Sequence, residues 1–484
     1  MVFLGIDIGT SSVKAIIVDE RDNEVASASA PLRVDRPRPL WSEQNPADWW
    51  SATTAALDEL AARAPRNMEA VAAIGLSGQM LGVTLLDASD APIRPALLWN
   101  DGRAGAECAE LAGAIPDFVD RVGCRPMPGF SAPKLLWLAR HEPDAIKRTR
   151  KILLPKDFVR LCLSGDIATD LADGSATLLM NTRAGTWAED ITRACGISTA
   201  LLPPPIESGA VSGSLRDTLA ARWKLRRGLP IAGGAGDNMC GAVGAGVIRR
   251  GDACISLGTS GVYFVANDTF VPARDQGMHT HRHAVEGLFA QQGCVLSAAA
   301  ALSWLMELLK IDSAERFLAE IENADLATDG IPVFTPYLTG ERTPHDDPAA
   351  SATFSGLRMG MGPLHLGRAV LEGVAFALAD CQDALRDACA PIEQIMLIGG
   401  GARSRFWAQL IANAIDRPLA IPVQAALGPA LGAARLARQA IGGTLVPSET
   451  PVSELVMPDA AAQEGLARRR AIYRAHYPHQ KDRA

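Results

Sequence analysis

The residues most suited to chemistry lie in a glycine-containing turn near the N-terminus, where residues 5–14 read GIDIGTSSVK. Glycine at a hairpin tip lets backbone N–H groups approach an anion, and the hydroxyls of Thr10 and Ser11 add further donors. Asp7 lies inside the first apolar run, where an acid is unusual, and a lone carboxylate beside such a turn suits a Mg²⁺ ligand. Lys14 could neutralise a phosphate. An ordinary hairpin with a capping aspartate is the alternative interpretation.

The same tip recurs in the second half of the chain. Residues 6–16 read IDIGTSSVKAI and residues 255–265 read ISLGTSGVYFV, so the Gly-Thr-Ser triplets are 249 residues apart. Each copy is an apolar run, a polar turn and a second apolar run, which is typical of a β-hairpin. A short match can arise by chance, but an offset of half the chain favours two duplicated domains. Because Ser256 replaces Asp7 in the second copy, we predict one nucleotide held between the domains.

A second carboxylate follows a glycine-rich strand end, where residues 233–238 read GGAGDN. An acid that ends a strand and opens a helix lies where open α/β sheets bind ligands. Asp237 could therefore accept a proton from a hydroxyl nucleophile. An N-cap aspartate is the alternative interpretation. The glycines favour a ligand site, because they clear side chains from one face of the turn.

Two further turns have binding character. Residues 399–403 read GGGAR after an apolar run, and a strand that enters glycines before a helix lets a nucleotide approach closely. Their spacing matches neither the dinucleotide nor the P-loop pattern, and a tight packing turn is the alternative. Residues 99–103 read WNDGR, in which an indole and paired polar groups suit a polyhydroxylated ligand. A surface turn with an Asp–Arg pair is the alternative there.

Two other clusters are assigned structural roles. The alternating His279, His281 and His283 could ligate a metal, but alternation also places them on one face of a strand, which we predict. The basic run Arg468–Arg470 with Arg474 is predicted to form a solvated helix face rather than a nucleic-acid patch.

These turns need strands and helices to position them, and the two element types alternate along the chain, as in α/β layers. We predict strands over 71–76, 82–86, 93–99, 229–234 and 394–398, and helices over 46–63 (with Ser42 or Asn45 as cap), 238–247 and 404–415. The alanine-rich segment Gly293–Leu309 is predicted to be a core helix. A domain boundary near residue 245 gives domains over 1–245 and 246–484.

Composition excludes several classes of protein. With 484 residues, 48% hydrophobic and 21% charged, the chain is expected to form two or more globular domains. A net charge of −7 argues against nucleic-acid binding. Nine cysteines without a C-x-x-C pair argue against disulfides and structural zinc. Without a signal-peptide pattern or a spanning apolar run, we expect a soluble, cytoplasmic protein with no membrane partner.

Taken together, the motifs resemble those of the FGGY carbohydrate kinases, and among them the bacterial xylulokinase branch. The resemblance runs essentially from end to end and rests on GIDIGTSSVK at 5–14, WSEQNPADWW at 41–50, LLWNDGR at 97–103, PGFSAPKLLWLARHEP at 128–143, LLPKDF at 153–158, GAGDN at 234–238, SLGTSGVYF at 256–264, PYLTGERTPH at 336–345, RAVLEGVAFALAD at 368–380, LIGGGARSRFW at 397–407 and GPALGAARLA at 428–437.

The resemblance implies an α/β fold of two actin-like (ribonuclease-H-like) domains, with ATP and a small sugar in the cleft between them. It implies that Asp237 is the general base and that Asp7 helps to hold Mg²⁺. The residues that would contact ATP are Gly9, Thr10, Ser11, Lys14, Gly258, Thr259, Gly399, Gly400, Gly401, Ala402 and Arg403. Those that would face the sugar are Gln79, Met80, Leu81, Trp99, Asp101, Arg103 and Asn238. A homodimer is one assembly that we consider.

One departure from the family pattern concerns the sugar. Xylulokinases usually read Gly-Gln-Met-His-Gly where this chain has Leu81 between Met80 and Gly82. Leucine cannot bond a hydroxyl, and a missing donor can discriminate strongly between substrates. D-xylulose is the expected substrate, and another ketopentose, a substituted sugar or a polyol is the alternative.

Two rivals from other classes have less support. An actin-like or Hsp70-like ATPase would need sugar-independent activity, polymerisation or a separate peptide-binding module. A sugar-sensing regulator would need an added helix-turn-helix. We expect neither module in this sequence.

Overall fold

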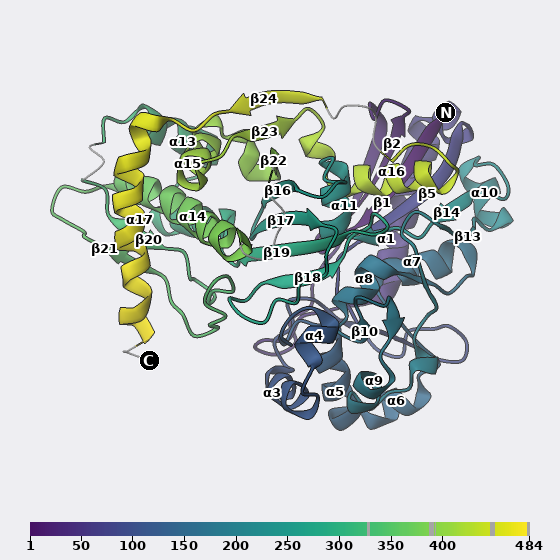
Figure 1. The fold of residues 1–484 in the computed structure, drawn as a ribbon. Coiled ribbons are helices and arrows are strands. Elements are labelled where there is room, and N and C mark those ends of the chain that lie inside the picture. The colour runs from purple at the N-terminus through teal and green to yellow at the C-terminus, as the bar shows by residue number, and fades with distance from the viewer. Residues whose placement is uncertain (327–329, 387–391, 393, 446–450, 482–484) are drawn as a thin grey trace.

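The structure, a computed structural model, describes residues 1–326, 330–386, 392, 394–445 and 451–481. Two large mixed sheets form its framework, one from each half of the chain, and they lie side by side in Figure 1. The N-terminal half also carries a lobe of short helices, drawn in blue below its sheet. The predicted α/β class and two-domain architecture are confirmed.

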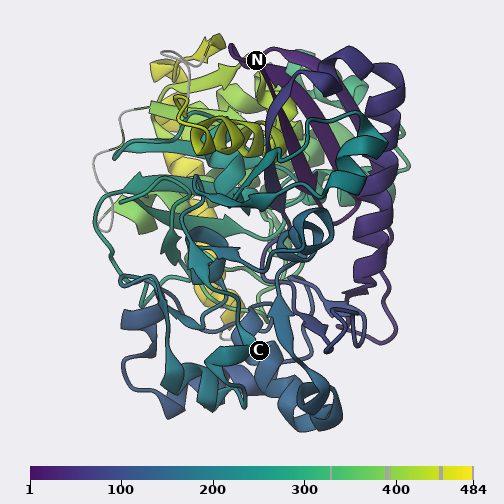
Figure 2. The ribbon, with the colours of Figure 1, turned by 90° about the vertical axis from the view of Figure 1, so that its right-hand side faces the viewer.

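The N-terminal sheet is built around the first hairpin. Its strand order is β13 (Val211–Ser214), β14 (Pro230–Ala232), β5 (Val71–Gly78), β1 (Val2–Ile8), β2 (Ser12–Asp19) and β3 (Glu24–Pro31), with β15 (Ala235–Gly236) also paired to β5. Strand β1 is antiparallel to β2 and parallel to β5. One face of the sheet packs on α1 (Pro46–Arg63), α7 (Pro155–Ser164) and α10 (Asp217–Trp223). Figure 2 shows α1, in purple, beside these strands.

The C-terminal sheet repeats this plan. Its order is β18 (His279–Arg282), β19 (Phe289–Val295), β17 (Gly261–Asn267), β16 (Asp252–Leu257), β22 (Gln394–Ile398), β23 (Leu419–Pro422) and β24 (Val452–Val456). The hairpin β16–β17 is antiparallel and β22 runs parallel to β16, as β5 does to β1. One face is covered by α12 (Ala299–Leu309), α13 (Ala314–Asn323), α14 (Pro363–Arg386) and α15 (Arg405–Ile415), and α17 (Ala460–Lys481) packs outside α15. Both predicted hairpins are therefore confirmed.

The lobe of short helices is inserted between the strands of the first half. It comprises α3 (Gly105–Ala114), α4 (Phe118–Val122), α5 (Ser131–His141), α6 (Pro143–Arg148), α8 (Leu171–Ala176) and α9 (Glu189–Ala194). The short helix α2 (Pro65–Glu69) is not part of this lobe and follows α1 directly. Small two-stranded pairs join the helices of the lobe: β4 (Glu43–Gln44) with β7 (Ala96–Leu97), β6 (Thr84–Leu86) with β8 (Lys151–Leu153), β9 (Thr169–Asp170) with β12 (Pro205–Ile206), and β10 (Met180–Asn181) with β11 (Thr186–Trp187). Among the described helices, none is both long and apolar enough to cross a bilayer.

One helix connects the two halves. Helix α16 (Pro429–Ala440) comes late in the chain, yet it packs against β1 and β5 of the N-terminal sheet and against α11 (Asp237–Gly244). A side chain at Gly5, Gly75 or Gly432 would overlap a backbone oxygen of the facing element, so only glycine permits this approach. The domain boundary near residue 245 stays a prediction, and packing crosses that position through α16.

A buried ion-pair cluster anchors α16. Asp22, in the turn after β2, is 1% exposed and pairs with Arg435 at 2.8 Å and Arg438 at 2.9 Å. Removing one partner of such a cluster leaves uncompensated buried charge. The cluster therefore fixes the helix to the first hairpin.

Most predicted elements are found, with two informative differences. The predicted helices over 46–63 and 404–415 appear as α1, capped by Asn45, and as α15, capped by Ser404. The strand predicted over 93–99 is reduced to β7. The predicted helix Gly293–Leu309 is wrong at its start, because residues 293–295 pair with β17 and the helix begins only at Ala299. Small apolar residues suit either state, and an available strand partner decides between them.

The arginines of the C-terminal helix form a solvated face only in part, since Arg468 is exposed and pairs with Glu464 of the same helix. Arg469 is 5% exposed and pairs with Glu372, while Arg470 and Arg474 both pair with Asp380. The prediction of a solvated face was therefore wrong for Arg469 and Arg470, because the acids that they meet arrive from α14, far away in sequence.

The predicted strand histidines are confirmed, and the cysteines are unpaired. His279 and His281 lie buried on β18, and His283 follows it. In the described part of the chain no three His, Cys, Asp or Glu side chains form a metal-binding group. The described cysteines are free thiols, and Cys389 lies outside the described residues.

The close packing of α16 gives a stability prediction. Gly75→Ala places a methyl group against the Ala433 carbonyl, so we expect the free energy of unfolding to fall by about 3 kcal/mol. Gly113→Ala, in a helix with open space around it, is the control and should leave stability unchanged or raise it by up to about 1 kcal/mol. Urea unfolding measures both, and equal effects would contradict the packing argument.

Candidate active site

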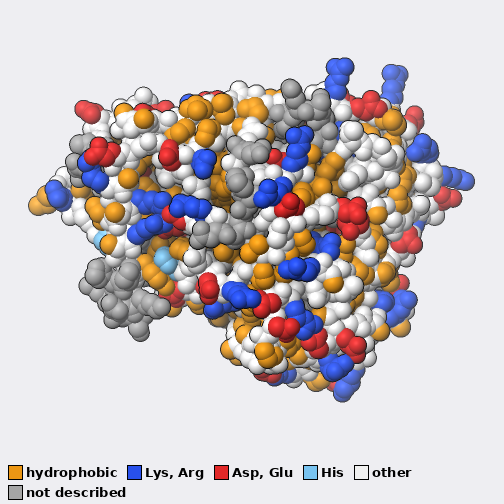
Figure 3. All heavy atoms as spheres, viewed as in Figure 1, with side chains coloured by type: hydrophobic (Ala, Val, Ile, Leu, Met, Phe, Trp, Pro, Cys, Tyr) orange, Lys and Arg blue, Asp and Glu red, His pale blue; other side chains and the backbone are white. Residues whose placement is uncertain are grey.

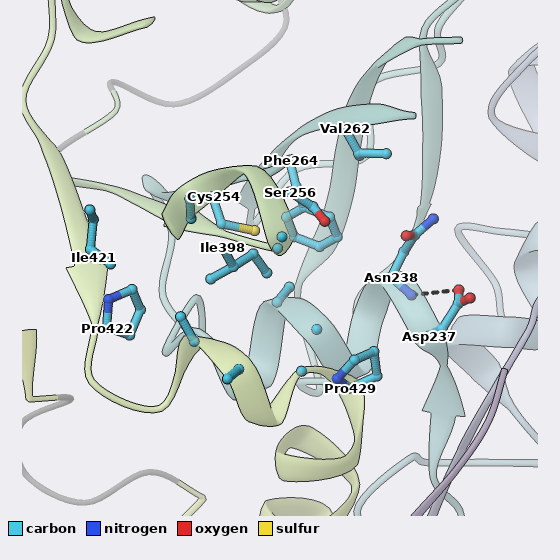
Figure 4. A pocket seen from close by; sticks show the side chains of 18 of the residues that line it. Asp237, Asn238, Cys254, Ser256, Val262, Phe264, Ile398, Ile421, Pro422 and Pro429 are labelled. Atoms are coloured by element: carbon cyan, nitrogen blue, oxygen red, sulfur yellow. Dashed lines mark hydrogen bonds between the residues drawn. The ribbon is translucent and has the colours of Figure 1, made fainter. Parts of the chain in front are cut away.

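The main cavity lies on the face of the C-terminal sheet that turns toward the N-terminal half. It has a volume of about 550 Å³. Its walls come from α11, β16, β17, β22, β23 and the segment that leads into α16, and the lining includes Asp237, Asn238, Cys254, Ser256, Val262, Phe264, Ile398, Ile421, Pro422 and Pro429 (Figure 4). Strand pleating explains the lining, because Ile255 and Leu257 point into the core while Ser256 between them points into the cavity.

The glycine turn after β22 forms one wall. Gly399 has φ +93°, a conformation that favours glycine, and it passes close to the backbone of Leu257. Gly400 has no neighbour where a side chain would stand, so its face of the turn is open. Ala402 and Arg403 also line the cavity, whereas Gly401 packs on Leu257. Four of the five residues predicted here for the nucleotide thus line the cavity, and Gly401 does not.

Asp237 stands at the other end of the cavity, as the first residue of α11. Its Oδ1 accepts a 2.8 Å hydrogen bond from the backbone N–H of Asn238, which Figure 4 shows as a dashed line. Loss of hydration and then the negative charge of Asp7 raise the pKa of Asp237 to about 7. A carboxyl group with this pKa can both take up and release a proton near neutral pH.

Asp7 lies on β1, opposite Lys14 of β2. Its Oδ1 accepts a 2.7 Å hydrogen bond from the Ser77 hydroxyl. Burial raises the pKa of Asp7, and the bond from Ser77 and the charge of Lys14 oppose this shift. The Lys14 ammonium itself donates to the carbonyl of Ala426 at 3.0 Å, so it bridges the first hairpin to the cavity wall.

The two hairpin tips are tight turns with exposed hydroxyls. Gly9 N–H bonds Ser12 and Gly258 N–H bonds Ser260, which closes each turn on itself. Ser11 and Thr259 are exposed at the ends of these turns. Their hydroxyls are therefore free to meet a ligand.

A hydrogen-bond network joins the first tip to the predicted sugar residues. The Thr10 hydroxyl donates to Gln79 Oε1 at 3.2 Å and accepts from Trp99 Nε1 at 3.0 Å. Gln44 completes the network, because its Nε2 donates to the Thr10 carbonyl at 2.7 Å and its Oε1 accepts from Gln79. Sequence reasoning missed Gln44, whose only signal was its place in the motif at 41–50. Met80 packs on Gly236, directly before Asp237.

Asp101 and Arg103 are more buried than a surface turn would allow. Asp101 accepts from the backbone N–H of Ser42 at 2.7 Å and from Arg103 Nε at 2.8 Å. Arg103 also pairs with Glu43 at 2.6 Å and stacks over the Trp41 ring at 3.6 Å. Within the described residues, Arg103 Nη1 has no hydrogen-bond partner. Trp99, in contrast, is 44% exposed.

The comparisons with known families agree with this architecture. The model of the N-terminal domain of the FGGY family of carbohydrate kinases matches residues 2–244, and the model of its C-terminal domain matches residues 253–441. The chain therefore belongs to the FGGY family of carbohydrate kinases, and it is an ATP-dependent sugar kinase.

Within this family, the chain is similar over nearly its whole length to several xylulose kinases. The xylulose kinase of Escherichia coli K12 is 40% identical over 480 residues, which cover 98% of each chain. The xylulose kinase of Klebsiella pneumoniae is 43% identical over 91% of this chain and 90% of its own. The crystal structure of a "xyloylose kinase" from Brucella ovis superposes with a TM-score of 0.95 at 40% identity and covers both chains completely.

The raised pKa of Asp237 predicts a pH-dependent stability. The unfolded carboxyl titrates near 4 and the folded one near 7, so Asp237 destabilises the fold progressively as the pH rises through this interval. Asp237→Asn should therefore stabilise the protein, and the gain at pH 8 should exceed that at pH 5 by about 2 kcal/mol. Denaturant unfolding at both pH values measures this difference.

Asp87→Asn is the control for this experiment. Hydrogen bonds from Ser89 and Ala91 lower the pKa of Asp87, so its contribution changes only below the ordinary range for a carboxyl group. Its effect on stability should be the same at pH 5 and pH 8. A gain for Asp237→Asn that is equally independent of pH would contradict the raised pKa.

Proposed function

We propose that this kinase transfers the γ-phosphate of ATP to the terminal hydroxyl of D-xylulose, which yields D-xylulose 5-phosphate and ADP. The observation that carries the proposal is the position of Asp237, a carboxyl group with a pKa near 7 at the end of the glycine-lined cavity. The end-to-end similarity to xylulose kinases supports the choice of sugar. A cytoplasmic location and a homodimer belong to the same proposal.

In this mechanism Asp237 accepts the proton of the attacking hydroxyl. The sugar oxygen forms a bond to the γ-phosphorus in line as the bond to the β,γ-bridging oxygen breaks, and ADP leaves with the electron pair. Because the phosphoryl group carries most of the chemistry, the protein contributes position and charge stabilisation. A pKa matched to neutral pH suits a general base. Approach of the two domains would exclude water and limit ATP hydrolysis.

The cavity is proposed to hold ATP. The turn at 399–403 would lie against the adenosine, where its open glycine face admits a flat ring. The two hairpin tips would bind the phosphates through the hydroxyls of Thr10, Ser11 and Thr259, while the N–H groups of Gly9 and Gly258 hold the turns in shape. Lys14, which already reaches the cavity wall, would add positive charge.

Mg²⁺ is proposed to bind beside Asp7. The residues fit such an ion, because Asp7 and Asp237 are oxygen donors, and burial followed by the negative charge of Asp7 raises the pKa of Asp237. When bound, the ion would neutralise charge on the phosphates. The chain's own contribution is Asp7, held in place by Ser77.

The sugar is proposed to lie between Asp237 and the network around Thr10. Trp99 would offer its exposed indole to the sugar face, and Asn238 would contribute an amide at the start of α11. Gln79, Met80 and Leu81 would form the opposite wall. The buried Asp101 and Arg103 would act from beneath this surface, Arg103 through its unpartnered Nη1.

Leu81 keeps a second candidate open, namely another ketopentose, a substituted sugar or a polyol. Its side chain is partly exposed and packs between two apolar clusters of the core. It provides no hydrogen bond to a sugar hydroxyl. A substrate with an apolar group, or no substituent, next to Leu81 would leave no hydroxyl without a hydrogen-bond partner there.

The roles of the two acids predict separable defects. Asp237→Asn should lower kcat by about a thousandfold, because the base is lost, while calorimetry shows ADP binding within about twofold of wild type. Asp7→Asn should instead raise the Mg²⁺ concentration for half-maximal rate by about tenfold. Asp87→Asn is the control and should change neither quantity. Near wild-type turnover in Asp237→Asn would refute its role as the base.

The role of Leu81 is tested by restoring a donor. Histidine tolerates the left-handed backbone of this position, where φ is +68°, so Leu81→His should fold. We expect kcat/KM for D-xylulose to rise by about tenfold relative to a polyol, in a coupled ATP assay. Leu81→Ala removes the leucine without adding a donor and should give no such gain. If wild type and Leu81→His show the same preference, Leu81 does not face the sugar.

A further inference from the structure

A lysine is buried behind the two walls of the proposed sugar site. Lys134 lies on α5 with its side chain fully buried. Its ammonium donates to the carbonyl oxygens of Leu81 and Leu98, both at 2.8 Å, and of Leu97 at 3.3 Å. These carbonyls belong to two separate segments, one of which carries Gln79–Leu81 and the other Trp99.

The three carbonyl contacts favour the charged form of this lysine, whereas burial lowers its pKa to about 7. Three carbonyl oxygens need three donors, and only the ammonium form of lysine has three N–H bonds. Within the described residues, no carboxylate lies within 4 Å of the Lys134 nitrogen to form an ion pair, so the carbonyl oxygens are its direct partners and the charge of Asp101 acts on it only from farther away. Burying a cation in this way is costly, and an apolar side chain would fill the same space without that cost. A packing role therefore does not account for a lysine here.

The backbone at Leu81, whose carbonyl Lys134 binds, is in a conformation that needs support. Leu81 has φ +68°, which is uncommon for residues other than glycine. Its carbonyl accepts a second hydrogen bond, at 2.9 Å, from the hydroxyl of Ser131 in the same helix. Two side chains of α5 therefore hold the peptide that follows Leu81.

The same helix supports the other wall. Trp137 of α5 packs edge-on against Trp41 at 5.5 Å, and the Arg103 guanidinium lies 5.1 Å from the Trp137 ring. Helix α5 thus reaches the turn at 97–103 through both Lys134 and Trp137. It forms a platform beneath the sugar-facing segments.

We propose that Lys134 is a positioning residue for the sugar. It fixes the backbone of Leu81 relative to that of Leu97 and Leu98, and thereby the gap between the two walls that receive the sugar, without touching the sugar itself. The inference rests on the proposed function, because it takes these two segments as the sugar site. The nucleotide cavity has no contact with Lys134 among its lining residues.

Lys134→Met tests this assignment, since methionine keeps the length of the side chain and removes all three donors. We expect the KM for D-xylulose to rise by about tenfold or more, with the KM for ATP within about twofold of wild type. A general loss of structure would instead affect both substrates. An unchanged KM for D-xylulose in a folded Lys134→Met protein would overturn the proposal.

Lys151→Met is the matched control. Lys151 also donates to backbone carbonyls, those of Ala200 and Leu202, but on β8 and away from the sugar segments. Its replacement removes the same chemistry and should leave both KM values unchanged. If Lys151→Met raised the KM for D-xylulose as much as Lys134→Met does, the effect would not be specific to the hydrogen bonds of Lys134.

Ser131→Ala keeps the proposal testable if Lys134→Met does not fold. It removes one of the two donors to the Leu81 carbonyl, so the KM for D-xylulose should rise by about two- to fivefold, again without a change for ATP. No change in the KM for D-xylulose would contradict the proposal. Wild-type turnover of D-xylulose is measured first, because its absence would refute the proposed substrate rather than the positioning role of Lys134.

Discussion

The structure depends on the contact of helix α16 with two glycine-containing strands of the opposite half. Gly5 and Gly75 leave room for the helix backbone to lie directly on β1 and β5, and Asp22 anchors it through two buried arginines. The segment that leads into α16 forms part of the cavity wall, and Lys14 bonds to it. This packing therefore brings the first hairpin next to a cavity formed largely by the second half, which neither half could achieve alone.

Once the halves are joined, electrostatics defines the reactive end of the cavity. Asp7 and Asp237 come from different strand ends. Burial raises the pKa of both carboxyl groups, and the negative charge of Asp7 raises the pKa of Asp237 further. Burying these two acids near each other costs free energy of folding. Sites of this kind lower stability for the sake of chemistry. The charges visible on one face of the surface, in contrast, are interspersed by sign (Figure 3).

The sugar side is organised by hydrogen bonds between segments rather than by one element. Thr10, Gln44, Gln79 and Trp99 form one network, and Lys134 ties the same segments together from behind. Lys134 is buried and comes from α5, a helix that holds none of the residues proposed to contact the sugar. Rigid support of this type is what holds a binding wall within fractions of an ångström of its required place.

The sequence alone determined the two hairpins, the α/β class, the family, and Asp7, Asp237 and the glycine turn as candidate site residues. These are local signals, because apolar alternation and turn residues act within a few positions. The contacts of Lys134, Gln44 and Arg469 were decided by tertiary structure, since their partners lie on other elements and a side chain's type does not reveal what it will meet. The split of the alanine-rich segment into β19 and α12 has the same cause, because pairing with β17 outweighs a weak local preference.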